Sequence, residues 1–190
     1  MILGAVVAVL GIYLFGIRPW HEHWGATRDE ITRSMPGDDI VTVPGLRATR
    51  AIIIAAPPEM IWPWLVQMGF RRGGWYSIDA IDNEGKPSAS QIIPELLDLK
   101  VGDKIGLNSA VALDVTLMEP YKFMLWQGGG AITMSWGLYP IDEGHTVLVL
   151  REYESYRLSQ PWWIITDPGG FLMARQTLLG IKARAEKPHT

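Results

Sequence analysis

The 190-residue sequence contains no cysteine, which excludes disulfide bonds, thiol catalysis and zinc–thiolate sites. It also lacks an excess of basic residues, because its formal net charge at pH 7 is −3. A nucleic-acid-binding surface needs clustered Lys and Arg, so we expect no DNA or RNA partner. With 48% apolar residues the chain is long enough for one domain with a real core, preceded by an N-terminal appendage.

Histidine is also scarce, with four in the chain. His21 and His23 form an H-x-H pair, but no carboxylate or third histidine follows at a helpful spacing, so we expect a solvated linker, no metal site and no cofactor. In the central part of the chain the only histidine is His145, in a turn. General acid–base catalysis usually needs a group tuned near neutrality, and the sequence does not single one out.

Residues 1–17 form a run without a charged residue. As a helix this run would be ~25 Å long, a marginal bilayer span. A signal peptide would need a basic start and an A-x-A site, and a buried helix would need a polar face; the run has neither. Arg18, Trp20 and Trp24 supply a basic and aromatic flank. We therefore expect a membrane-anchor helix over residues 1–18, with the soluble domain on the cytoplasmic side by the positive-inside rule.

A connector is expected over residues 19–48. Thr27 and Glu30 have the spacing of a capping box, which predicts a short helix that ends at Pro36-Gly37.

The stretch from residue 49 to 83 organises the rest of the chain. Its β-branched run ends at Pro57-Pro58, which can open a helix. Ile61, Trp64, Leu65 and Met68 then form one apolar helical stripe, with a kink expected at Pro63. The helix should stop at Gly69, before a basic glycine-rich turn and the pair Trp75-Tyr76.

The second half of the chain alternates short β signals with turn signals. Strands are predicted at residues 104–107, 111–119, 122–127, 132–139 and 146–153. Such even punctuation indicates a meander of antiparallel strands. Asp167-Pro168 is a good N-cap and first position for a final helix that runs to Arg184. The order strand, helix, meander, long helix is an α+β pattern.

Several segments resemble a known family. The strand-APPE-helix opening at residues 49–68 resembles the SRPBCC superfamily, which includes START lipid-transfer domains, the birch-pollen allergen group and polyketide cyclases/dehydrases. The text WPWLVQMG…RRGGWYS looks like a membrane-anchored bacterial branch of it, as do WGAT, PGDD, PEL…LKVGDKI and LLGIKARAE. The resemblance covers roughly residues 20–186.

The resemblance implies a helix-grip domain over residues 49–186, a curved antiparallel sheet around a long C-terminal helix with an apolar cavity between them. It implies no reaction. Nine tryptophans, each with a large apolar face, would suit such a cavity. The candidate ligand-binding residues are Trp64, Arg72, Trp75, Tyr76, Trp126, Trp136, Arg151 and Phe171. Trp64 and Phe171 lie on helix stripes, where a plain core role is the alternative.

Two arginines among these candidates raise questions of charge. Arg72 is expected to pair with Asp79 or Asp82 at the cavity rim. If Arg151 points inward, it must be salt-bridged or meet an anionic ligand group, because an unpaired buried charge is costly; the alternative is a solvated arginine at a strand end.

Three functions remain open from the sequence. The first is a membrane-tethered binder or carrier of a small hydrophobic, lipid-like molecule. The second is an enzyme of the cyclase/dehydrase kind that uses the same cavity, and the third is an accessory or interaction module whose cavity is filled by its own Trp and Met side chains. Because one scaffold hosts many functions, the fold alone does not separate them.

For the enzyme the sequence offers the carboxylates of Asp79, Asp82 and Asp103. An open cavity would favour the first two functions over the third. Ionisable groups that converge inside it would favour the enzyme, and a purely apolar lining would favour the binder.

Overall fold

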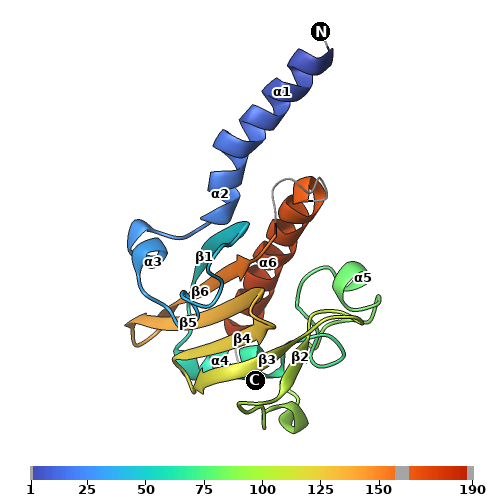
Figure 1. The fold of residues 1–190 in the computed structure, drawn as a ribbon. Helices are drawn as coiled ribbons and strands as arrows, with labels where there is room; N and C mark the ends of the chain where they lie inside the picture. Colours follow the sequence, from blue (N-terminus) through green and yellow to red (C-terminus); the bar gives the residue numbers. More distant parts are fainter. Residues whose placement is uncertain (1, 157–162, 188–190) are drawn as a thin grey trace.

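The computed structural model describes residues 2–156 and 163–187 and is built on one six-stranded antiparallel sheet. Along the sheet the strands follow the order β1-β6-β5-β4-β3-β2, so the first strand pairs with the last and the others form a meander (Figure 1). Their bounds are β1 Leu46–Ile54, β2 Lys104–Gly106, β3 Ala112–Glu119, β4 Phe123–Gly128, β5 Ile132–Asp142 and β6 His145–Glu154. The predicted meander is therefore confirmed.

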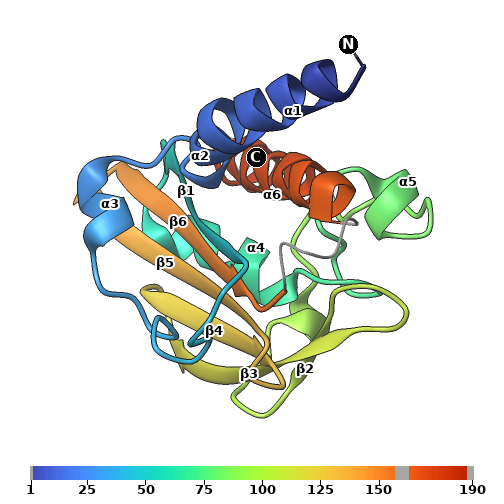
Figure 2. The same ribbon diagram turned by 45° about the horizontal axis from the view of Figure 1, so that its top comes forward.

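Two helices cover one face of the sheet. The long C-terminal helix α6 (Trp163–Ala185) contacts β1 and the shorter helix α4 (Pro58–Gln67), and it lies across the hollow of the sheet (Figure 2). The main core fills the space beneath them, with Trp136, Leu150 and Leu178 among its fully buried members. This is the expected α+β, helix-grip-like arrangement. Two short helical turns, α5 (Asp79–Asp82) and η2 (Pro94–Leu96), lie in the loop between α4 and β2.

The start of α6 differs from the prediction. Asp167 was expected as its N-cap, but the helix already begins at Trp163, and Asp167 and Pro168 lie inside it. Pro168 lies beyond the first turn of the helix, so it removes one intrahelical hydrogen bond. The Asp167 carboxylate instead accepts a hydrogen bond from Arg18 Nε at 2.7 Å. A partner distant in the sequence thus replaces the local cap.

The N-terminal segment is helical but interrupted. Helix α1 (Ile2–Ile12) passes into a π-helical turn, η1 (Tyr13–Ile17), and then into α2 (Arg18–Glu22), and in Figure 1 this segment extends away from the sheet. Of the helices over residues 2–156 and 163–187, none has the length and apolar character needed to cross a membrane. The predicted membrane-anchor helix, and the cytoplasmic placement that rested on it, are therefore not supported.

The connector covers the outer face of the sheet, opposite α6. It contains the short helix α3 (Arg28–Thr32), which carries the predicted capping box between Thr27 and Glu30. Met35 packs there against Ala51 and Val149 in a small second core. The sheet is thus buried on both sides near β1 and β6.

Arg151 on β6 holds the connector to the sheet. The residue is only 3% exposed, and its guanidinium donates to the Asp38 carboxylate at 2.9 Å. It also donates to Thr49 Oγ1 and to the carbonyl oxygens of residues 30, 31 and 33. Arg151 therefore lies on the face away from α6. Its charge is paired within the protein, but the salt bridge was expected for an Arg151 that points into the cavity, and the predicted ligand-binding role of Arg151 is not supported.

Replacing Arg151 with Met should lower the free energy of unfolding by about 3–5 kcal/mol, because Asp38 and three carbonyl groups lose their buried donor. Urea denaturation would measure this loss. The matched control is Lys104→Met, which breaks the exposed pair with Asp114 and should cost under about 1 kcal/mol. Equal losses in the two variants would contradict the structural role of Arg151.

Candidate functional site

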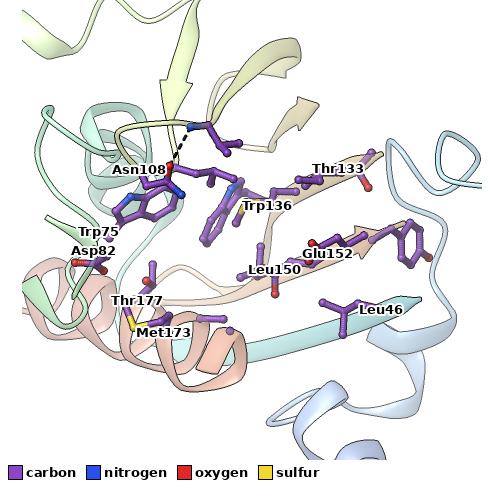
Figure 3. Close-up of a pocket in the computed structure, with 18 of the residues that line it drawn as sticks. Leu46, Trp75, Asp82, Asn108, Thr133, Trp136, Leu150, Glu152, Met173 and Thr177 are labelled. Atoms are coloured by element: carbon purple, nitrogen blue, oxygen red, sulfur yellow. Dashed lines mark hydrogen bonds between the residues drawn. The ribbon is translucent and has the colours of Figure 1, made fainter. Parts of the chain in front are cut away.

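A cavity of about 470 Å3 lies between the sheet and α6 (Figure 3). Its lining comes from β1, β5, β6 and α6, together with the segment around Trp75 and the following loops. Much of the wall is apolar, with contributions from Trp75, Met134, Trp136, Leu150, Met173 and Ala174. The polar groups that reach it are Asp82, Asn108, Thr133, Thr177, Glu152 and Glu154. Such a mixture is typical of a small-molecule site.

The segment Trp75-Tyr76 is held in place by α4 and α6. The Tyr76 hydroxyl donates to the Trp64 carbonyl at 3.0 Å, and its backbone N–H donates to Ser88 Oγ at 3.0 Å. On the other side, Gly180 of α6 lies so close that a Cβ there would be 2.0 Å from the Tyr76 carbonyl oxygen. Only glycine permits this approach. The neighbouring Trp75 is thereby fixed at the cavity wall.

Three tryptophans form one aromatic cluster beside the cavity. Trp126 contacts Trp75 at 6.0 Å and Trp136 at 5.6 Å between ring centroids. Trp75 and Trp136 line the cavity, whereas Trp126 is fully buried and packs against both without reaching it. None of the three indole N–H groups has a hydrogen-bond partner among the described residues. Two unpaired donors therefore belong to cavity-lining side chains.

The structure brings together only part of the predicted set. Trp75 and Trp136 line the cavity, and Trp64, Tyr76 and Trp126 pack in the core next to it. The remaining three, Arg72, Arg151 and Phe171, lie outside the cavity wall. Phe171, which periodicity placed on the inner stripe of α6, turns toward the N-terminal helices. There its ring stacks on His21 at 5.2 Å.

The predicted ion pair of Arg72 is wrong. Its guanidinium donates to the carbonyl oxygens of Val66 and Leu96, at 3.2 and 3.0 Å, and forms no salt bridge with Asp79 or Asp82. Asp79 instead accepts hydrogen bonds from the backbone and hydroxyl of Ser88. Arg72 thus ties the end of α4 to η2, and burial lowers its pKa.

Asp82 is the most unusual polar group of the site. Both carboxylate oxygens are buried, and neither has a hydrogen-bond partner within residues 2–156 and 163–187. The nearby Ser77 hydroxyl donates to the Met173 carbonyl instead. Burial raises the pKa of Asp82, and the negative charge of Asp79 raises it further. A carboxylate in this state favours any donor that can enter the cavity.

Glu152 and Glu154 line the wall formed by β6, and a charged network lies next to them. Glu152 pairs with Arg50, which also donates to the His21 carbonyl at 2.8 Å. Burial raises the pKa of Glu152 against the opposing effect of Arg50. Glu154 forms no ion pair within the described residues, and its pKa is raised by burial and then by Glu152. This end of the cavity is acidic, and Arg50 offsets part of its negative charge.

Sequence reasoning did not propose Asp82, Glu152 or Glu154 as ligand-facing. Asp82 entered as a possible partner of Arg72 and as one of the carboxylates that an enzyme could use. Strand alternation could have found the glutamates, because Leu148, Leu150 and Glu152 share one face of β6 and the first two are plainly apolar. The alternation along β6 was clear from the sequence, but which of its two faces points into the cavity was not.

Comparison with known proteins gives likeness of fold only. No family model and no curated protein matches the sequence. Among solved structures, KanY matches with 12% identity over 74% of this chain and 97% of its own, at a TM-score of 0.46. The polyketide-cyclase-like protein Cgl2372 of Corynebacterium glutamicum matches with 16% identity over 76% and 97%, at 0.41. Aha1 of Colwellia psychrerythraea matches with 13% identity over 72% and 96%, at 0.40.

The similarity is too coarse to carry information about function, so the functional argument rests on the cavity itself.

Asp82→Asn should stabilise the ligand-free protein at neutral pH. A carboxyl group whose pKa is raised in the folded state binds protons more readily there than in the unfolded chain. Wild-type stability therefore falls as pH rises from the ordinary Asp value, about 3.9, through the raised one. Asparagine removes this dependence of stability on pH. The variant should therefore melt at a higher temperature than wild type at pH values above the raised pKa of Asp82, and at the same temperature below the ordinary Asp value.

Thermal denaturation across pH 3–8 would measure the gain. The control is Asp39→Asn, at an exposed position in the connector, which should shift stability by no more than about 0.5 kcal/mol at any pH. An Asp82→Asn variant that is less stable than wild type at pH 7 would mean that the carboxylate has a stabilising partner.

Proposed function

We propose that this protein binds a small, largely apolar molecule in the cavity between the sheet and α6. The observation that carries the proposal is the cavity itself. Its volume of about 470 Å3 falls within the range of roughly 300–1,000 Å3 found for ligand sites. Its wall combines apolar surface with a few polar groups that have no partner among the described residues.

The wall has the properties that favour an apolar ligand. Trp75, Trp136 and Met134 are each at least nine-tenths buried, so they offer rigid contact surface without large rearrangement. An occupant gains about 25 cal/mol for each Å2 of apolar area removed from water, and most of that area is its own, because these side chains are already nearly buried. An accessory module with a core filled by its own side chains would not keep this space, which speaks against the third function considered from the sequence.

Filling the cavity from α6 should block binding. Ala174 is 7% exposed and lines the cavity from α6, so Ala174→Phe places an aromatic ring in the space that the ligand would occupy. We expect wild type to bind the neutral fluorescent probe N-phenyl-1-naphthylamine. The variant should bind it about tenfold more weakly or worse, a loss of some 1.4 kcal/mol. Titration with the probe emission and the quenching of Trp emission as signals would measure both affinities.

The matched control is Leu172→Phe, which adds a ring on the exposed side of the same helix and should bind like wild type. Circular dichroism would establish that both variants are folded. Undiminished binding by a folded Ala174→Phe variant would place the probe elsewhere and contradict the proposal.

A further inference from the structure

The charges along the cavity wall are of one sign. Asp82, Glu152 and Glu154 reach the cavity, and no Lys, Arg or His is among the described residues that line it. Glu152 has Arg50 as its partner, behind the wall. Asp82 has none, and both of its oxygens are shielded from water. A fatty acid or another anionic ligand would therefore bring a second negative charge into an already acidic, poorly solvated site.

The surroundings of Asp82 point to a ligand independently of its charge. Trp75 lies beside it at the same end of the cavity, with Thr177 and Met173 of α6 facing both (Figure 3). Trp75 is only 6% exposed, yet its indole N–H has no partner within the described part of the chain. A folded protein rarely leaves a buried donor and a buried carboxylate unpaired in one place. A donor that enters the cavity can complete the carboxylate, whereas the indole N–H needs an acceptor.

From these observations we infer that the ligand is an amphiphilic amine, with its protonated amino group at Asp82 and its apolar part along Trp136, Met134 and Leu150. This inference rests on the proposed function. An ammonium group supplies the donors that the Asp82 carboxylate lacks, and the charge-assisted bond it forms is stronger than a neutral one. The indole ring of Trp75 adds a surface that attracts cations.

Asp82 is a better site for the amino group than the two glutamates. Glu152 is already paired with Arg50, so an approaching cation would meet that positive charge. Glu154 lies at the end of the cavity that adjoins Arg18, Arg50 and Asp167, where charges of both signs are present. Asp82 has no basic partner within the described residues, because neither of its oxygens accepts a hydrogen bond there.

Three ligands with the same alkyl chain but different head groups test the effect of charge at constant apolar contact. Dodecylamine, dodecanol and dodecanoate would each compete with N-phenyl-1-naphthylamine for the wild-type protein at pH 7 and below their micelle concentrations. We expect the amine to bind about tenfold or more tightly than the alcohol, and the alcohol more tightly than the carboxylate. Asp82→Asn should remove the advantage of the amine over the alcohol.

Two further variants locate the charge that matters. Asp39→Asn removes one exposed negative charge from the connector and should leave the amine preference intact, whereas an equal loss in this variant would show that only overall charge attracts the amine. Glu154→Gln should also retain the preference; if it is lost there and kept in Asp82→Asn, the assignment to Asp82 is overturned.

The outcomes also distinguish this inference from the proposed function. Binding of dodecanol without any preference for the amine overturns the inference and leaves the cavity as an apolar binding site. Failure of all three ligands to displace the probe, or of the probe to bind, rejects the proposed function and the inference together.

Discussion

The cavity depends on how α6 is held against the sheet. Near its C-terminus, Gly180 packs directly on the Tyr76 carbonyl, and Lys182 Nζ donates to the Ile53 carbonyl at 2.7 Å. Near its N-terminus, Asp167 is bound by Arg18. These contacts hold both ends of the helix against the rest of the protein. Between them the helix spans the curved sheet, and the cavity lies below its middle part. Of the α6 residues that line this space, Gly170, Ala174 and Thr177 are small, and Met173 is long.

The two faces of the sheet satisfy their polar groups differently. On the outer face, Arg151 meets Asp38, Thr49 and three carbonyl groups, so a buried charge is fully used in holding the connector. On the inner face, Asp82 and the indole groups of Trp75 and Trp136 have no partner among the described residues. Unmet polar groups cost stability, and where a chain retains them inside a cavity, function is the usual reason.

The sequence predicted the elements better than it predicted their faces. Regular alternation and turn residues were enough for β2 to β6, and Thr27 with Glu30 was enough for α3, because these signals are local. Arg151 and Phe171 were assigned to the cavity because each lies on an element that borders it. Their actual partners, Asp38 and His21, are more than 100 residues away in the chain. No local pattern contains such contacts.

The prediction for residues 1–17 also failed because it used local sequence alone. An uncharged stretch followed by Arg18 and two tryptophans suggested a membrane span, but the α-helix changes to a π-helical turn at Tyr13, and Arg18 pairs with Asp167 of α6. That Asp82 has no partner was missed for the opposite reason. A carboxylate with no partner leaves no signature in a sequence, because what distinguishes it is the absence of contacts in the folded protein.

The central claim, that a small molecule occupies the space between the sheet and α6, is tested most directly by the methyl groups of methionine. Met134 and Met173 line the cavity, whereas Met35 is buried on the opposite face of the sheet. In protein with 13C-labelled methionine methyl groups and unlabelled dodecanol, we predict intermolecular nuclear Overhauser effects from Met134 and Met173 to the alkyl chain, and none from Met35. Bound dodecanol that shows no such effect to either cavity methionine would contradict the account.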